Sequence, residues 1–154
     1  PDSKRYPGSD DEYRVLLDRH LSVANDLFQA GEAIYVYRSH LGEKRLKGRQ
    51  RHQIAGRQFR EAMKRLPTEL HAEDDEDGYY FVRALQTIWI PDFFNELARD
   101  VADWKEAGVT FVSPRTKNIY CPYDGGMDVF LFSEDPSVLE GKYRSWMSSR
   151  QDKK

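Results

Sequence analysis

Two carboxylates and a thiol occur in one short stretch of the C-terminal third. Cys121, Asp124 and Asp128 are the residues concerned. A thiol can act as a nucleophile, and paired carboxylates can act as acid and base or hold a cation. A phosphatase-type C-x5-R motif would need Arg at position 127, which is Met127. An enzyme with a site near these residues is one alternative. The favoured interpretation makes Asp124 a turn residue, Asp128 an acceptor of local backbone bonds, and Cys121 a small core residue.

Metal and cofactor chemistry finds little support in the residue spacing. The four histidines lie at positions 20, 40, 52 and 71 and show no paired zinc-ligand spacing. Residues 73–78 resemble the opening of an EF-hand loop, but its twelfth position, which should be Glu, is Ala84. No G-x-x-x-x-G-K-[ST] phosphate loop or G-x-S-x-G elbow occurs. We therefore expect no metal and no cofactor, and a structural role for His20.

Charge is strongly patterned, although the net charge is only −2. Residues 43–65 contain nine Lys or Arg and two Glu, and residues 69–77 contain six acids and no Lys or Arg. Either block can face a charged partner, or the two can neutralise each other. The acidic block and the carboxylates of the C-terminal third form the predicted partner-binding set: Glu69, Glu73, Asp74, Asp75, Glu76, Asp77, Asp124 and Asp128. The alternative, nucleic-acid-binding set is Lys44, Arg45, Lys47, Arg49, Arg51 and Arg57.

Hydrophobic periodicity predicts four helices and five strands that would position these residues. Ser9 and Glu12 form a capping box before a helix that ends near Gly31. Further helices are predicted over residues 55–66, from 91 or 92 to Gly108, and from 136 onward, with Asp135 before Pro136 at the start of the last. Strands are predicted over 33–39, 79–90, 109–112, 118–123 and 127–132, the last two joined as a hairpin. The residues between 42 and 53 and between 68 and 78 are predicted loops.

Short connections between the late strands favour antiparallel pairing, because a parallel crossover needs about a dozen residues or more. We therefore predict an α+β fold with a mainly antiparallel sheet and helices packed on one face. The chain of 154 residues corresponds to one domain over residues 9–150, with a flexible tail at 1–8 and a frayed end at 151–154.

Composition narrows the class of protein. Aromatic residues make up 13% and charged residues 32% of the chain, which argues against both disorder and a membrane protein. The single cysteine excludes an internal disulfide framework. The polar start, residues 1–11, contains no apolar signal segment, so we expect a cytoplasmic location and no membrane partner.

The C-terminal third resembles a bacterial family known only as a domain of unknown function. The stretch 119–129, which reads IYCPYDGGMDV, and the stretch 142–147, which reads KYRSWM, carry the resemblance, and residues 90–93 fit it loosely. The family shows an acidic and a basic residue where this chain has Gly125 and Gly126. Small bacterial α+β domains of this kind often look like immunity proteins, which neutralise a toxin made by the same cell. The resemblance implies no catalytic residues.

These observations lead us to expect a non-enzymatic protein-binding domain, of the kind that neutralises a bacterial toxin. Nuclease clefts are cationic because they bind phosphate, so an acidic loop on a rigid domain can occupy such a cleft as a phosphate mimic. The expected partner is accordingly a protein, such as a toxin domain with a basic cleft. Nucleic acid is the less favoured partner, because residues 44–57, which contain the alternative nucleic-acid-binding set, include no Phe, Tyr or Trp on which bases could stack.

Overall fold

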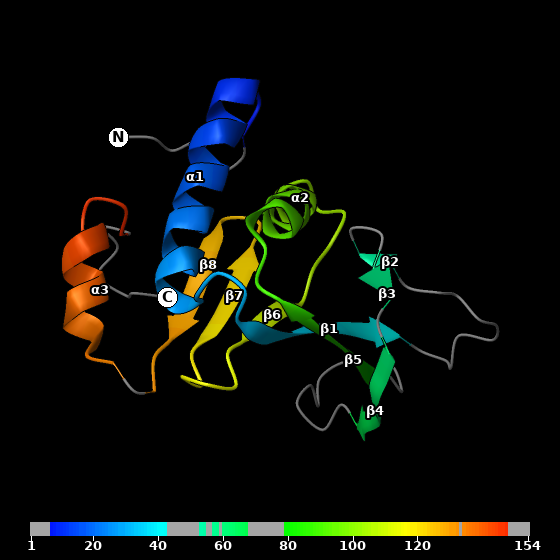
Figure 1. Cartoon of the computed structure of the whole chain (residues 1–154). Coiled ribbons are helices and arrows are strands. Elements are labelled where there is room, and N and C mark those ends of the chain that lie inside the picture. Colours follow the sequence, from blue (N-terminus) through cyan, green and yellow to red (C-terminus); the bar gives the residue numbers. More distant parts are fainter. Residues whose placement is uncertain are drawn as a thin grey trace.

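The computed structural model describes residues 7–42, 53–54, 57–58, 60–67, 79–132 and 134–147. Three helices and eight strands lie in these ranges (Figure 1). In chain order they are α1 (Asp10–Leu27), β1 (Ala33–Gly42), β2 (Gln53–Ile54), β3 (Arg57–Gln58), β4 (Arg60–Pro67), β5 (Tyr79–Ile88), α2 (Pro91–Ala102), β6 (Val109–Val112), β7 (Ile119–Tyr123), β8 (Gly126–Phe130) and α3 (Pro136–Tyr143).

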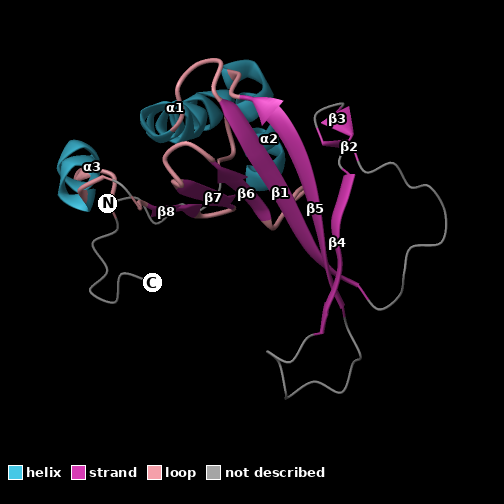
Figure 2. Ribbon diagram, turned by 60° about the horizontal axis from the view of Figure 1, so that its bottom comes forward, coloured by secondary structure: helices cyan, strands magenta, loops and turns pink. Residues whose placement is uncertain are grey.

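Six of the strands form one antiparallel sheet in the order β4-β5-β1-β6-β7-β8, and β2 pairs with β3 alone. Strand β1 lies inside the sheet, between β5 and β6. Helices α1 and α2 lie over one face of the sheet, and α3 lies beside α1 (Figures 1 and 2). The predicted α+β fold, with an antiparallel sheet and helices on one face, is confirmed.

Helix α1 begins where the capping box predicts. The Ser9 side chain accepts a hydrogen bond from the Glu12 N–H at 3.4 Å, and the Glu12 carboxylate accepts one from the Gly8 N–H at 2.6 Å. Three acidic side chains in the first turn favour the positive end of the helix dipole. The helix ends at Leu27 rather than at Gly31, whose φ of +77° serves the turn that leads into β1.

The helix predicted over residues 55–66 is wrong, because this part of the chain contains β3 and β4. Strand β4 pairs with β5 through a register that shifts between Glu61 and Met63 and again between Met63 and Leu66. Each shift places an extra residue in β4, so apolar residues recur at intervals of three or four rather than two. That spacing imitates one face of a helix.

The predicted end of α2 is also wrong. The helix ends at Ala102, and Trp104, expected on its apolar side, has a φ of 60° and is 66% exposed. Gly108 lies beyond the helix and serves a close approach to β1. A Cβ at position 108 would lie 2.4 Å from the Ser39 carbonyl oxygen, and the φ of Gly108 is +63°.

The core lies between the helices and the sheet and is rich in aromatic rings. Phe94 of α2 packs against Trp89, Phe111 and Tyr120 with ring centroids 5.1 to 5.7 Å apart. These four side chains are at most 1% exposed. Helix α3 adds Tyr143 to the core, whereas Val138, predicted on its apolar side, is 73% exposed.

Candidate functional site

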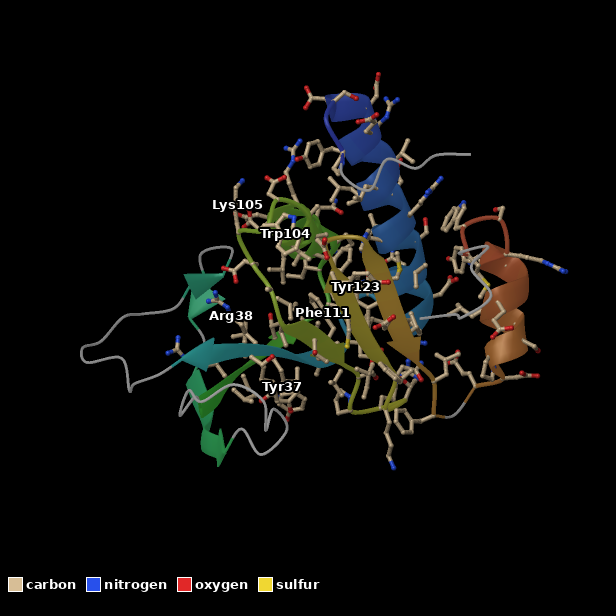
Figure 3. All side chains as sticks on the ribbon, turned by 180° about the vertical axis from the view of Figure 1, so that it is seen from behind. Tyr37, Arg38, Trp104, Lys105, Phe111 and Tyr123 are labelled. Carbon is tan, nitrogen blue, oxygen red and sulfur yellow. The ribbon has the colours of Figure 1, made fainter. Side chains whose placement is uncertain are left out.

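The two faces of the sheet differ in what covers them. Along β1, Ile34 and Val36 point toward the helices and are fully buried, while Tyr35 and Tyr37 point the other way. Figure 3 shows Tyr37 below β1 and Arg38 above it, on the side of α2. No described helix lies over the Tyr35 and Tyr37 side, which we call the open face; the opposite side is the covered face.

Strand register assigns residues of five strands to the open face, because cross-strand partners share a face. They are Ala33, Tyr35, Tyr37 and Ser39 of β1; Val82, Ala84, Gln86 and Ile88 of β5; Thr110 and Val112 of β6; Ile119, Cys121 and Tyr123 of β7; and Gly126, Asp128 and Phe130 of β8. Three large side chains of this set are well exposed: Ile88 at 49%, Tyr123 at 43% and Phe130 at 52%.

The hairpin of β7 and β8 brings two of the sequence-predicted residues together. Cys121 and Asp128 are direct cross-strand partners on the open face, and Asp124 lies in the two-residue turn between Tyr123 and Gly126. Asp128 is exposed, and the Cys121 Sγ lies 3.5 Å from the Thr110 Oγ1. The predicted hairpin is confirmed, and Cys121 lies on the open face rather than in the core.

Glycine at position 126 makes room for an aromatic ring at the end of this hairpin. A Cβ on Gly126 would lie 3.1 Å from the Tyr123 hydroxyl oxygen, so the Tyr123 ring lies back over its cross-strand partner. An aromatic ring over a glycine is a recurrent way of protecting the strand backbone. The ring is thereby held at one border of the open face.

The predicted structural role of His20 agrees with its surroundings. The His20 Nδ1 lies 2.5 Å from the Tyr120 hydroxyl, under α1 and on the covered face. Burial lowers the pKa of His20 to about 4 and raises the pKa of Tyr120, so a neutral imidazole and a neutral phenol share this hydrogen bond. His20 and Cys121 are therefore on opposite faces of the sheet. Within the described residues, no group of three or more His, Cys, Asp or Glu could hold a metal ion.

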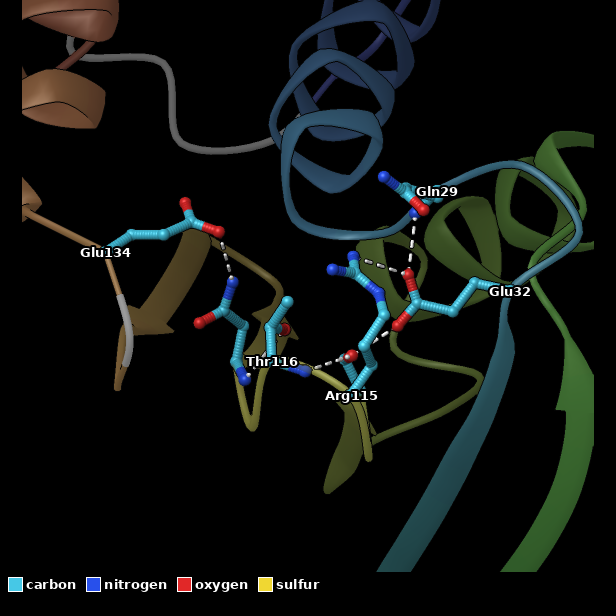
Figure 4. Close-up of polar contacts among 7 residues, drawn as sticks. Gln29, Glu32, Arg115, Thr116 and Glu134 are labelled. Atoms are coloured by element: carbon cyan, nitrogen blue, oxygen red, sulfur yellow. Dashed lines mark hydrogen bonds and ion pairs between the residues drawn. The ribbon is translucent and has the colours of Figure 1, made fainter.

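A chain of hydrogen bonds fixes the loop between β6 and β7 at the border of the open face (Figure 4). Glu32, which precedes β1, accepts from the Ser113 hydroxyl, from the Gln29 N–H at 2.9 Å and from Arg115 at 3.1 Å. Burial favours a higher pKa for Glu32, but these bonds together hold it below its ordinary value. This chain of hydrogen bonds continues from Ser113 through Thr116 and Asn118 to Glu134.

The two charged blocks begin at the same end of the sheet. Gly42, the last residue of β1, is the cross-strand partner of Tyr79, the first residue of β5, and Tyr79 also pairs with Pro67 of β4. The basic residues that follow Gly42 and the acidic residues between Pro67 and Tyr79 therefore extend from three neighbouring strand ends.

Most residues of these two blocks lie outside the described residues. This holds for Glu69, Glu73, Asp74, Asp75, Glu76 and Asp77 of the acidic set and for Lys44, Arg45, Lys47, Arg49 and Arg51 of the basic set. Arg57 opens the short strand β3. The roles assigned to both sets stay predictions.

Comparison with known proteins places the chain in a family. Residues 1–151 match the family described as Domain of unknown function (DUF3885). The chain belongs to this family. No curated protein matches it, and no solved structure does. Among the described residues, no helix is both long and apolar enough to cross a membrane.

The sequence analysis did not predict that the open face is a candidate binding surface. The signal was present in residues 33–37, where aromatic Tyr35 and Tyr37 alternate with Ile34 and Val36. A strand that is apolar on both sides predicts two packed faces. The described helices cover only one of them.

Proposed function

We propose that this chain is a non-enzymatic protein-binding domain that binds its partner on the open face. One observation carries the proposal: Ile88, Tyr123 and Phe130 point from one face of the sheet, and each is more than two-fifths exposed. Tyr123 and Phe130 lie on the neighbouring strands β7 and β8, and Ile88 lies farther across the sheet on β5. Exposed apolar side chains on one face favour an interaction site, and aromatic residues supply much of the binding energy in such interfaces.

Charge on the open face favours a protein over a nucleic acid as the partner. The open-face positions of β1, β5, β6, β7 and β8 include no Lys or Arg and one acid, Asp128, with Asp124 in the adjoining turn. The cation assigned to this face by register is Arg60 of β4, which pairs with Ala84 at the opposite border of the sheet. Phosphate groups would meet repulsion from these carboxylates. A protein surface with apolar side chains around a Lys or Arg fits this face, because the cation would meet Asp128.

The proposal extends to the class of partner. The acidic block of residues 69–77 and the family resemblance support an immunity-type function, in which the chain neutralises a toxin with a basic cleft. The block lies in the chain between Pro67 and Tyr79, which are cross-strand partners at one end of the sheet that has the open face. A cationic nuclease cleft would attract these acids, and complementary charge of this kind accelerates association at low salt.

Co-purification from the native source, with variants as bait, tests the open face. A partner retained by the wild type is expected to be lost with Phe130→Asp and Tyr123→Ala. Val138→Asp in α3 is the matched control, since Val138 is also an exposed apolar residue but is 73% exposed and lies away from the open face. Equal retention by Phe130→Asp and the wild type would contradict the proposal.

The toxin-neutralising mechanism has a separate test with the purified partner. Changing Glu73, Asp74, Asp75, Glu76 and Asp77 to their amides is expected to slow association at least tenfold at about 50 mM salt and much less at high salt. An unchanged on-rate at low salt would remove the acidic block from the mechanism while leaving the open face as the binding surface.

A further inference from the structure

Two arginines lie side by side on the covered face, away from the proposed binding surface. Arg38 of β1 and Arg83 of β5 are direct cross-strand partners. Arg38 comes two residues after Val36 and Arg83 two residues before Leu85, so both arginines share the face of these core residues. Figure 3 shows Arg38 on the side of Trp104 and Lys105, where the chain leaves α2. Like charges at this distance repel, so the pair needs an anion.

One carboxylate forms an ion pair with Arg38. The Glu106 Oε2 lies 2.9 Å from the Arg38 Nη2, and the two side chains are 13% and 20% exposed. Burial raises the pKa of Glu106 against the opposing effect of Arg38, and Asp100 raises it further. Glu106 contributes one negative charge to two positive charges.

Arg83 is the member of the cluster that lacks an acceptor. Its Nη1 is buried and has no hydrogen-bond partner. Burial and the neighbouring Arg38 both lower the pKa of Arg83. A buried guanidinium N–H without an acceptor costs free energy, because the group has lost water and gained nothing in return. The side chain as a whole is half-buried, so a ligand can approach its exposed part from solvent, and a rotation of the guanidinium would bring Nη1 into contact with it.

We propose that Arg83, with Arg38 beside it, binds a carboxylate group. The guanidinium fork matches the two oxygens of a carboxylate, which would give Nη1 the acceptor it lacks. Charge selects the carboxylate among oxyanions: Arg38, Arg83 and Glu106 sum to one positive charge, which a carboxylate balances. A phosphate dianion would leave the cluster negative and would repel Glu106.

The carboxylate can come from a free acid or from an acidic side chain of another protein, and both present the same group. A competing explanation lies in this chain. Glu61 of β4 is the cross-strand partner of Arg83, and a pairing between them would occupy the site from within. The experiment therefore includes variants of both residues.

Titration of the arginine Nε–H signals by NMR tests the proposal on the full chain. Sodium acetate, sodium phosphate and sodium chloride are compared at neutral pH and a constant ionic strength of about 100 mM, where the Debye length is about 10 Å. Acetate is expected to give a saturable shift of the Arg83 signal. Phosphate is expected to give a weaker one, and chloride none.

Variants separate binding at Arg83 from general anion effects. Arg83→Gln is expected to abolish the acetate shift at Arg38, and Arg83→Lys, which keeps the charge but loses the fork, to weaken it about tenfold. Arg115→Gln is the matched control, since Arg115 is a 52% exposed arginine that pairs with Glu32, and it should leave the Arg83 response intact. If Arg83→Gln does not fold, Arg83→Lys carries the test.

The source of the group is resolved by a blocked Glu-containing tetrapeptide. Binding tighter than acetate at equal carboxylate concentration assigns an acidic side chain, and equal binding assigns a free acid; both support the proposal. A missing acetate shift at Arg83, or tighter binding of phosphate than acetate, would overturn it. So would an acetate site that opens only in Glu61→Gln, because Glu61 would then be the natural occupant.

Discussion

The covered and open faces of the sheet are built from the same strands but carry different kinds of interaction. On the covered face, Ile34 and Val36 are fully buried against α1 and α2. On the open face, Tyr123 and Phe130 keep about half of their surface accessible. Burial against helices stabilises the fold, whereas apolar area left in water contributes little to folding and remains available for binding. Stability and the proposed protein-binding surface thus lie on opposite sides of one sheet.

The largest effect is expected from a truncation on the covered face. Phe94→Ala should lower the free energy of unfolding by about 3–5 kcal/mol, because Phe94 is fully buried among three other aromatic rings and its removal leaves a cavity. Urea denaturation measures this loss. A change below about 1 kcal/mol would show that the covered face is not the source of stability.

Acidification is expected to weaken the covered face through His20. The pKa of His20 in the folded chain is about 4, below the ordinary 6.5, so between these pH values the unfolded chain binds a proton that the folded chain does not bind. The free energy of unfolding should be unaffected above pH 6.5 and should fall between pH 6.5 and 4, by up to about 3 kcal/mol. Comparing denaturation curves at neutral and acidic pH measures the slope. The same slope in His20→Gln would assign it to other groups.

Gly108 links the region after α2 to β1, and its replacement is expected to cost about 2 kcal/mol or more. A Cβ there would lie 2.4 Å from the Ser39 carbonyl oxygen, and the backbone φ of +63° is unfavourable for other residues. Gly108→Ala should therefore lower the midpoint of thermal unfolding. Gly141→Ala in α3 is the matched control: nothing lies within 4 Å of its added Cβ, and a gain of about 0.5–1 kcal/mol is expected.

Glu32→Gln is expected to cost about 1–2 kcal/mol at neutral pH, because a charged acceptor of three hydrogen bonds is lost at the border between the two faces. The pKa of Glu32 is held below its ordinary 4.5, so its contribution is present above that pH and is lost as pH falls through the folded pKa. Denaturation at pH 7 and pH 3 measures this. A penalty that persists at pH 3 would contradict a charge-based role.

The smallest effect on folding is expected on the open face. Phe130→Ala should change the free energy of unfolding by no more than about 0.5 kcal/mol, because the side chain is 52% exposed. Denaturant titration of this variant beside Phe94→Ala completes the contrast. A loss approaching that of Phe94→Ala would mean that the open face is part of the core.

Local signals were sufficient to predict elements whose ends are specified by nearby residues. Ser9 and Asp135 cap α1 and α3 with their own side chains, and the turn at Asp124 closes the β7–β8 hairpin. These contacts span a few residues, so a sequence window contains them. The fold class followed from the short loops between the late strands.

Structural features that depend on contacts between residues far apart in the chain could not be predicted from the sequence. The bulges of β4 exist only in pairing with β5, and they turned a strand pattern into an apparent helix. Gly108 looked like a helix end because its real requirement, the backbone of Ser39, is far away in the chain. The pairing of Arg38 with Arg83 and the shared origin of both charged blocks at Gly42 and Tyr79 likewise depend on strand register.

The interior position of β1 sets the order in which the sheet can assemble. Residues 33–42 leave the ribosome before both neighbours of β1, which are residues 79–88 and 109–112. Closing such long loops costs chain entropy before any contact repays it, so pairing at the centre of the sheet is slow compared with the local meander of β6, β7 and β8. During synthesis the apolar strand β1 therefore has no hydrogen-bonded neighbour until residues 79–88 have emerged, and it lacks the second until residues 109–112 have emerged, so it is open to aggregation in that interval.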